Sequence, residues 1–402
     1  MSGSRRIVVC HHGHENDVGY TENLFEFFSA NGIDHGFLDL RLPEPKAELR
    51  RHLADGPGVC FLGFNSQIDH SWLDSEPMVL AAARHGATVL QWICDHPSSR
   101  WPEFNYPDPA ATRFVFHTPN SQAYFERFCS SAAITAVAGS MGPNWRSRAP
   151  VGGDDVFDRR PFACLVALGL ARVGRTAEET EAEIEAVGPL GYAVKEGVRR
   201  ARYELDLPLE MVLTVVLAER GLSPDKATFN RVFRLYNDSI QTIRRGHVIR
   251  TASRFAATIQ SDKTAGALTE GGVATFREGV STNETLERMP LFRSVVSVSP
   301  DNDVIHDRTS NALNAGAVPI LEDNYAHRVR FTHGENALLF RYDDDSLAEC
   351  LALACGDPGR LYPIAERAMR MRDTRPFRFG SYQNIVALAN LDPGRLPSAI
   401  DP

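Results

Sequence analysis

Several features that define common protein classes are missing from this sequence. No apolar run approaches the ~20 residues of a membrane span, and Met211–Ala218 is among the longest. The N-terminus, MSGSRRIVVC, enters a strand pattern at once, without the apolar region of a signal peptide. The seven cysteines contain no CxxC pair, and Cys10, Cys60 and Cys94 lie inside apolar strand runs, where buried reduced thiols are expected. We therefore expect a cytoplasmic protein without a membrane span.

An excess of positive charge is also missing. Lys and Arg total 43 against 51 Asp and Glu, which gives a net charge of −8. This balance argues against a non-specific partner such as nucleic acid or an anionic membrane. The GxGxxG fingerprint of dinucleotide binders is absent, so an NAD or FAD enzyme is disfavoured. At 402 residues the chain is long for one hydrophobic core, and two domains are expected.

Residues 1–150 show an alternation of apolar runs and helical patterns. The predicted strands are Ile7–Cys10, Gly36–Leu40, Val59–Phe64, Ala87–Cys94, Arg113–His117 and Ile134–Ala138. The helices predicted between them lie around Thr21–Asn31, Pro45–Ala54, Trp72–His85 and Ser121–Phe128. Continuous apolar strands separated by helices indicate a parallel sheet covered on both faces. We predict an N-terminal Rossmann-like domain over residues 1–150.

The pattern changes after residue 150. Residues 151–253 have helical periodicity with almost no strand signal, which predicts a helical insertion that serves as a wall or an oligomer contact. The α/β alternation resumes in 254–380, a second predicted Rossmann-like domain. A last helix and tail follow at 381–402. The predicted strands of the second domain are Phe255–Gln260, Val273–Arg277, Val295–Val298, Val318–Leu321 and Ala337–Tyr342.

Polar loops that follow the strands are the candidate sites, because doubly wound sheets bind ligands at the carboxyl ends of their strands. The loop HHGHEND, residues 11–17, follows the first strand. His12 or His14 could act as a base there, and Glu15 could bind an acceptor; the alternative is a solvated polar turn. The spacing matches no standard zinc signature, so no metal is expected.

The loop QWICDHPSSRWPEF follows the fourth strand. Asp95 or His96 could serve as a catalytic base at the end of a buried strand. Arg100 and Trp101 could contact an acceptor, with the tryptophan offering a stacking surface. Alternatively, Asp95 caps a turn and the aromatic side chains pack beneath the loop.

The stretch from Ser294 to Asp323 reads as strand, polar loop, helix and strand, one βαβ unit. Free N–H groups at the start of its helix suit a diphosphate, and asparagines there can bond sugar hydroxyls; an ordinary helix cap is the alternative. The predicted donor-binding residues are Lys263, Arg277, Ser299, Asp303, His306, Asp307, Arg308, Thr309, Asn311 and Asn314.

The run DRTSNALNAGAVPILED, with NALLFRYDDDSLAECL and RRGHVIRTAS, resembles the donor-site segments of family-1-like glycosyltransferases, in particular their spore-maturation-protein-like (CgeB-like) branch. About a third of the chain carries the resemblance. It implies an α/β fold of the GT-B architecture, with two Rossmann-like domains facing a cleft, a helical insertion, and a C-terminal helix that crosses back. In one respect the chain departs from the family: the usual glutamate five residues before the helix-ending glycine is Asn311.

The resemblance implies a metal-independent enzyme that moves a sugar from a nucleotide-diphosphate sugar to a hydroxyl or other nucleophile. The acceptor, whether glycan, protein or small molecule, would lie in the N-terminal domain and the donor in the C-terminal one. No cofactor beyond the donor substrate is expected, and a homodimer is possible. Two alternatives remain open: a nucleotide-sugar epimerase or hydrolase on the same fold, and an inactive nucleotide-sugar-binding module.

Overall fold

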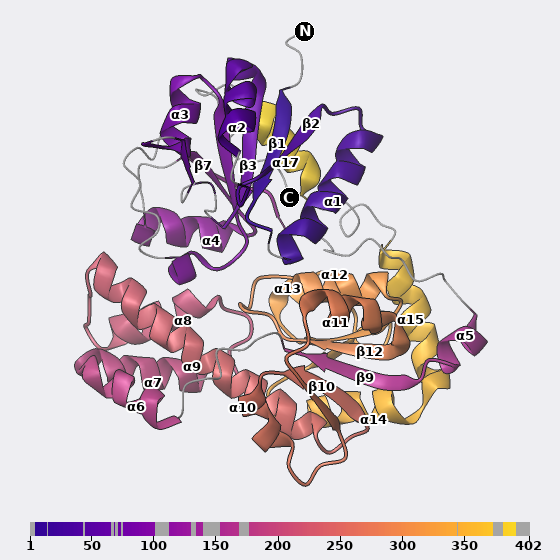
Figure 1. Ribbon diagram of the computed structural model, residues 1–402. Coiled ribbons are helices and arrows are strands. Elements are labelled where there is room, and N and C mark those ends of the chain that lie inside the picture. Colours follow the sequence, from indigo (N-terminus) through magenta and orange to yellow (C-terminus); the bar gives the residue numbers. More distant parts are fainter. Residues whose placement is uncertain are drawn as a thin grey trace. The chain divides into compact units, whose positions relative to one another are not determined.

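The computed structural model describes residues 5–13, 15–42, 45–65, 68, 71–73, 75–100, 112–129, 134–139, 153–168, 177–343, 345–372 and 381–390. The chain forms two units (Figure 1). The first unit comprises Met1–Arg146 together with Arg378–Pro402, and the second comprises Ser147–Phe377. Each unit contains one large sheet and is described by itself.

The first unit is built on a six-stranded sheet of order β2-β1-β3-β6-β7-β8, in which every pair of neighbours is parallel. The strands are β1 (Arg6–His11), β2 (His35–Asp39), β3 (Val59–Phe64), β6 (Thr88–Ile93), β7 (Thr112–Phe116) and β8 (Ile134–Val137). All six strands predicted for this region are confirmed. The continuous apolar runs produce strands that are buried on both faces, as expected for a parallel sheet.

Helices cover both faces of the first sheet. One apolar core joins the sheet to α1 (Glu15–Ala30) and to α17 (Tyr382–Asn390), and a second core joins it to α2 (Pro45–Ala54) and α3 (Met78–Arg84). The C-terminal helix α17, yellow in Figure 1, therefore belongs to the first unit. Beyond these, α4 (Pro119–Tyr124) continues into a π-helix, Phe125–Cys129.

One predicted helix of this unit is wrong at its start. The interval Trp72–His85 was expected to be helical, but β4 (Trp72–Leu73) and β5 (Glu76–Pro77) form a short antiparallel pair before α3 begins. Pro77 explains the late start, because proline disfavours helical backbone in the residue before it.

The second unit is built on a six-stranded parallel sheet of order β11-β10-β9-β12-β13-β14. The strands are β9 (Phe162–Ala167), β10 (Ala257–Ser261), β11 (Thr275–Glu278), β12 (Phe292–Ser297), β13 (Val318–Glu322) and β14 (Leu338–Phe340). In chain order this arrangement is 3-2-1-4-5-6, the strand order of Rossmann domains. The parallel α/β fold expected for both halves is confirmed.

The strand β9 corrects the prediction that residues 151–253 are almost free of strand. Its sequence, FACLVA, is a short apolar run, and such a run cannot be distinguished from part of a buried helix by periodicity alone. It pairs with both β10 and β12 and is therefore central to the second sheet.

The remainder of that segment is helical. Its helices are α5 (Asp154–Asp158), α6 (Ala177–Ala186), α7 (Pro189–Ala201), α8 (Leu209–Glu219) and α9 (Lys226–Ala252). Later in the chain, between and after the strands of the second sheet, come α10 (Lys263–Gly266), α11 (Thr282–Arg288), α12 (Asp307–Asn314), α13 (Tyr325–Arg328), α14 (Ser346–Gly356) and α15 (Pro358–Arg372). The longest, α9, begins where the Asp225 carboxylate accepts a hydrogen bond from the Thr228 N–H at 2.8 Å.

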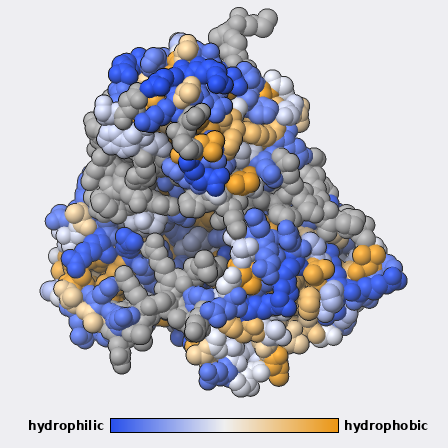
Figure 2. Space-filling model, in the orientation of Figure 1, coloured by the Kyte–Doolittle hydropathy of each residue, from blue (hydrophilic) through white to orange (hydrophobic). Residues whose placement is uncertain are grey.

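Among the described helices, none is both long enough and apolar enough to cross a membrane. Hydrophilic side chains cover much of the face drawn in Figure 2, and apolar side chains lie between them. Single exposed apolar residues, such as Trp72 and Tyr325, are normal on protein surfaces.

Candidate functional site

The strand order of the second sheet indicates where a ligand would bind. The order reverses between β9 and β12, which lie side by side although the chain leaves them in opposite directions across the sheet. In open α/β sheets, ligands bind at such a switch point, outside the carboxyl ends of the strands. The segment that leaves β12 at this point is Ser299–Asn302, here called the 299–302 loop.

The 299–302 loop is held by buried polar contacts. The Ser299 N–H donates to Glu322 Oε2 at 2.7 Å, and the Gln241 side chain donates to the Pro300 carbonyl at 2.7 Å. The Asn302 side chain donates to the Leu207 carbonyl, also at 2.7 Å. Contacts from β13, α9 and the segment before α8 therefore fix the loop before any ligand is bound.

Two charged residues at the centre of this network are fully buried. Arg244 donates to Asn302 Oδ1 at 2.8 Å and to the Ala201 carbonyl at 2.6 Å, and it lies 3.9 Å from Glu322 Oε1. The Tyr342 hydroxyl donates to the same Glu322 oxygen at 2.5 Å. Burial and Glu322 raise the pKa of Tyr342 well above its ordinary value, so the hydroxyl keeps its proton and remains a donor.

Sequence reasoning missed Glu322 and Arg244. Glu322 stands where the second apolar run of the βαβ unit ends, and it was interpreted only as a strand terminus. Arg244 belongs to the basic run RRGHVIR, whose contacts lie far away in the chain. The available signal was a charged residue at the carboxyl end of a buried strand.

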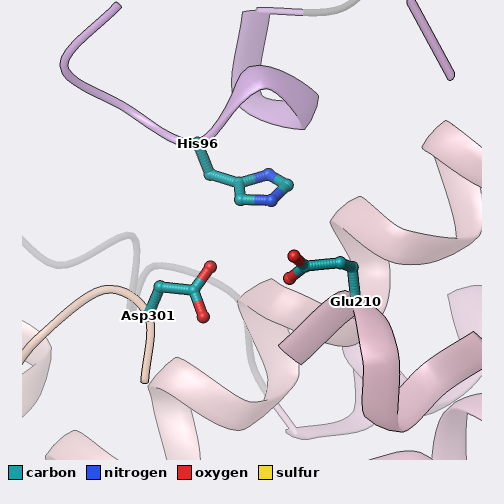
Figure 3. A group of neighbouring side chains, drawn as sticks. All are labelled: His96, Glu210 and Asp301. Carbon is teal, nitrogen blue, oxygen red and sulfur yellow. The ribbon is translucent and has the colours of Figure 1, made fainter. Parts of the chain in front are cut away.

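Two buried carboxylates also meet beside this loop. Figure 3 shows Glu210, at the start of α8, and Asp301 with their side chains pointing toward each other, and a carboxylate oxygen of each lies within 4.8 Å of the other. Asp301 Oδ1 also accepts from the Leu209 N–H at 3.3 Å, at the start of α8. Burial, followed by Asp303, raises the pKa of Asp301 to about 7, and burial with both aspartates raises the pKa of Glu210. His96, drawn in the same figure, belongs to the first unit.

The predicted donor residues at the start of α12 lie together. His306 caps the helix, with its Nδ1 accepting from the Arg308 N–H at 3.1 Å, and Asp307 accepts from the same N–H at 2.7 Å. Arg308 extends toward β12 and donates to the Val298 carbonyl at 3.4 Å. A guanidinium therefore lies at a helix N-terminus beside the switch point, which is an arrangement that favours anions.

Arg245, on α9, adds a second guanidinium that sequence reasoning did not single out. Its side chain forms no hydrogen bond or ion pair in the described part of the chain. Burial lowers the pKa of Arg245 to about 10, and Arg308 contributes to the same shift. Arg245, which has no bonded anion among the described residues and lies close enough to Arg308 for their charges to interact, is suited to hold a phosphate or diphosphate together with Arg308.

The other predicted residues of α12 are buried rather than open. Thr309 is fully buried, and its hydroxyl donates to Ser297 Oγ at 3.2 Å. Asn311 and Asn314 are 4% and 5% exposed. Their assignment to the donor stays a prediction.

Two predicted donor residues lie elsewhere in the second sheet. Arg277 is within β11, at the sheet edge, paired in register with Gln260. Three strand spacings of about 4.8 Å separate β11 from β12, so Arg277 is not brought to the 299–302 loop. Lys263 begins α10, after β10, but its side chain is outside the described part of the structure.

In the first unit, the loop after β1 is shaped by a glycine. The Gly13 N–H donates to His11 Nδ1 at 2.7 Å, and Gly13 has a φ of +72°. This positive φ favours glycine, and a Cβ there would also require the exposed Arg41 side chain to move. His12, half-buried, follows the same turn.

Asp95 lies at the carboxyl end of β6 and is exposed. Its carboxylate accepts from Asn65 Nδ2 at 3.2 Å, and its N–H donates to Asn65 Oδ1 at 3.1 Å. Asn65 follows β3 and has a φ of +46°, which asparagine tolerates better than most residues. The loops after β3 and β6 are thus joined, and Asp95 is oriented at the sheet edge.

His96 is tied into its own loop. Its Nδ1 accepts from the Ser98 N–H at 3.2 Å, which places the ring proton on Nε2, and its ring packs edge-on against Tyr124 with centroids 4.5 Å apart. Burial lowers the pKa of His96 to about 3. The imidazole is therefore neutral at pH 7 and a weak base.

The remaining predicted residues cannot be placed in the same detail. His14 and Trp101 lie outside the described residues, and of Glu15 and Arg100 only the backbone is described, at the start of α1 and at the end of a short 3-10 helix, Pro97–Arg100.

Neither a protein-family model nor a curated protein sequence matches the chain. Solved structures are similar at low identity. A glycosyltransferase from Rickettsia africae is 8% identical, with a TM-score of 0.45, over 96% of this chain and 99% of that chain. Anabaena HepE in complex with UDP-glucose is 9% identical, with a TM-score of 0.43, over 95% and 98%.

Sucrose-phosphate synthase from Thermosynechococcus elongatus is 10% identical, with a TM-score of 0.48, over 96% of this chain and 97% of that chain. Within this chain, each unit has the parallel six-stranded sheet that the predicted architecture requires, and the second sheet has the strand order of Rossmann domains. The spore-maturation-protein-like branch stays a prediction. Since each of these TM-scores is below 0.5, the function proposed below is derived from the residues of this chain.

Proposed function

We propose that this protein is a glycosyltransferase that uses a nucleotide-diphosphate sugar and no metal ion. The observation that carries the proposal is the Arg308 guanidinium at the N-terminus of α12, beside the switch point of the second sheet, with Arg245 close enough for Arg308 to lower its pKa. A diphosphate would neutralise both guanidiniums and lie at the positive end of the helix dipole. The rigid 299–302 loop would form the wall of the same site.

The reaction would be a displacement at the anomeric carbon. For an inverting transfer, Asp95 takes the proton of the acceptor hydroxyl, whose oxygen forms a bond to the anomeric carbon as the bond to the diphosphate breaks. The nucleoside diphosphate leaves with the electron pair, and Arg245 and Arg308 stabilise its added charge. Asp95 is preferred to His96 as the base because the low pKa of His96 makes it a poor proton acceptor.

Donor binding is tested first. A panel of nucleotide-diphosphate sugars is screened by thermal shift, since a ligand of the native state raises the apparent stability. The double variant Arg245→Gln/Arg308→Gln should lose at least about tenfold in donor affinity, because each guanidinium supplies a charge-assisted bond of about 1.5–3 kcal/mol. Arg231→Gln/Arg234→Gln, two exposed arginines on the same α9, is the matched control. No response to any nucleotide sugar would refute the proposal.

Transfer is tested separately from binding. Asp95→Asn should abolish transfer and leave donor affinity unchanged, because the amide cannot accept the proton but can still bond Asn65. Unchanged turnover would remove Asp95 from the mechanism. Product formation without any acceptor would indicate an epimerase or hydrolase, and binding without turnover would indicate the inactive module.

A further inference from the structure

A cavity of about 320 Å³ lies along the C-terminal part of α9, and the described residues that line it are His247, Arg250, Thr251 and Arg254. Positions 247, 250 and 251 share one face of α9, because they are spaced by three and four residues, and Arg254 follows two residues after the helix ends at Ala252. At 100° per residue, this face is opposite to that of Arg245. The cavity, here called the α9 pocket, is therefore distinct from the proposed diphosphate site.

The lining of the α9 pocket contains hydrogen-bond donors and positive charge. His247 and Thr251 are 8% and 5% exposed and form its floor, whereas Arg250 and Arg254 are exposed and form its rim. No carboxylate is among the described lining residues. Neither arginine forms an ion pair or a side-chain hydrogen bond in the described part of the chain.

A simpler role for these arginines is to neutralise the negative end of the helix dipole. The C-terminus of α9 does not need these arginines as caps, because other groups of the chain bond its last carbonyls. The carbonyls of Ile249 and Thr251 accept from the N–H groups of Ser253 and Arg254, and the Arg250 carbonyl accepts from Ser253 Oγ at 2.8 Å. The last carbonyls of α9 are thus satisfied without a guanidinium.

The glycine before the pocket also has a spatial role. Gly246 lies within α9, where glycine costs about 1 kcal/mol relative to alanine. A Cβ at this position would lie 3.2 Å from Arg250 Nη1, closer than ordinary van der Waals contact. The glycine therefore leaves room for the Arg250 guanidinium to lie along the helix at the rim of the pocket.

We propose that the α9 pocket is a second anion site that binds a phosphoryl group, either inorganic phosphate or the phosphate of a small metabolite. Arg250 and Arg254 match the bidentate geometry of phosphate oxygens, and the Thr251 hydroxyl and the His247 ring can add donors from the floor. The volume is at the lower end of the range of about 300–1,000 Å³ that is typical of ligand pockets, so a small ligand fits. The site does not depend on the proposed transferase activity.

The test is a calorimetric titration of the full chain with inorganic phosphate and with glucose 6-phosphate, at constant ionic strength, with glucose as the uncharged control. The wild type should bind at least one phosphorylated probe and not glucose. Arg250→Ala/Arg254→Ala should weaken binding at least about tenfold, because two charge-assisted contacts are lost. The matched control Arg231→Ala/Arg234→Ala removes the same charge from the same helix and should bind as the wild type does.

The two probes distinguish the source of the phosphate. Tighter binding of glucose 6-phosphate indicates a metabolite, and equal or tighter binding of inorganic phosphate indicates the free ion. Arg245→Gln/Arg308→Gln separates this site from the donor site, and it should retain the phosphate affinity of the wild type. Equal phosphate binding by wild type and Arg250→Ala/Arg254→Ala, or no binding by the wild type, would overturn the proposal and leave the proposed transferase function untouched.

Discussion

The two sheets share a parallel architecture, but the polar groups at their carboxyl edges are held in different ways. In the second unit, Glu322 and Arg244 are almost fully buried and fix the 299–302 loop through short hydrogen bonds. In the first unit, Asp95 is exposed and oriented by Asn65, and Asp39 is paired with an exposed arginine. Two edges of the same type therefore differ in how strongly their loops are fixed.

This difference has a physical consequence. Buried charges act in a medium of low effective dielectric, so their network is strong when complete and costly when one member is lost. Exposed pairs are screened by water and salt and contribute little. A loop that buried hydrogen bonds fix suits a ligand group of constant shape, such as the diphosphate of the proposed donor. Loops that only exposed contacts fix can adapt their conformation to a proposed acceptor.

The largest effect is expected when the buried network is broken. Glu322→Ala leaves Arg244 buried without its carboxylate and removes the acceptor of Tyr342, so the free energy of unfolding should fall by about 3–5 kcal/mol. Urea denaturation followed by circular dichroism measures the loss. Glu335→Ala, the same change at an exposed position, should be nearly neutral. Equal stability of the two variants would show that the network does not hold the second unit.

The strands of both large sheets could be predicted from the sequence, with one important exception. The strands carry continuous apolar runs, and these identified eleven of the twelve strands in the two large sheets, the exception being β9. The strand that was not predicted, β9 with the sequence FACLVA, gives the second sheet its order 3-2-1-4-5-6 and places β12 at the switch point. Periodicity cannot supply such an assignment, because six apolar residues fit a strand and a helix equally well.

The candidate site could be predicted less completely. His306 and Arg308 follow a strand directly, so local spacing was sufficient to find them. Glu322, Arg244 and Arg245 act through contacts between residues distant in the chain, which pattern reasoning on one sequence does not show. Thr309 is a residue for which local spacing suggested a ligand contact. In the structure its buried hydroxyl instead donates a hydrogen bond to Ser297 Oγ.

A fall in stability from pH 4 to pH 7 is expected from a buried carboxyl of the second unit. Asp301 has its pKa raised from 3.8 to about 7, by burial and then by Asp303, so the folded state binds more protons than the unfolded state between these values. Through this group, stability should therefore be greatest near pH 4 and fall as pH rises toward 7. Thermal unfolding against pH measures the trend, and Asp301→Asn, which can still accept from the Leu209 N–H, should flatten it. An unchanged slope in this variant would exclude Asp301 as the origin.

A moderate effect is expected at Asn65 in the first unit. Asn65→Ala loses the hydrogen bonds to Cys94 and Asp95 and keeps a φ of +46° that alanine tolerates poorly, so stability should fall by about 1–3 kcal/mol. Asn65→Gly loses the same bonds without the backbone strain and should be the less destabilised variant in urea denaturation. If glycine is equally destabilising, backbone strain at residue 65 is negligible and the hydrogen bonds account for the whole effect.

The smallest effect is expected at Asp39, the last residue of β2 in the first sheet. Its carboxylate accepts from Arg41 Nη2 at 2.7 Å and from the Arg41 N–H at 2.9 Å, and these bonds lower the pKa of Asp39 to about 2. The stabilisation is present above the ordinary value of 3.8 and lost as pH falls toward 2. Because Arg41 is exposed, Asp39→Asn should cost only about 0.2–1 kcal/mol in urea denaturation, and less at high salt. A loss comparable to that of Glu322→Ala, or one insensitive to salt, would show that the first edge is as firmly held as the second.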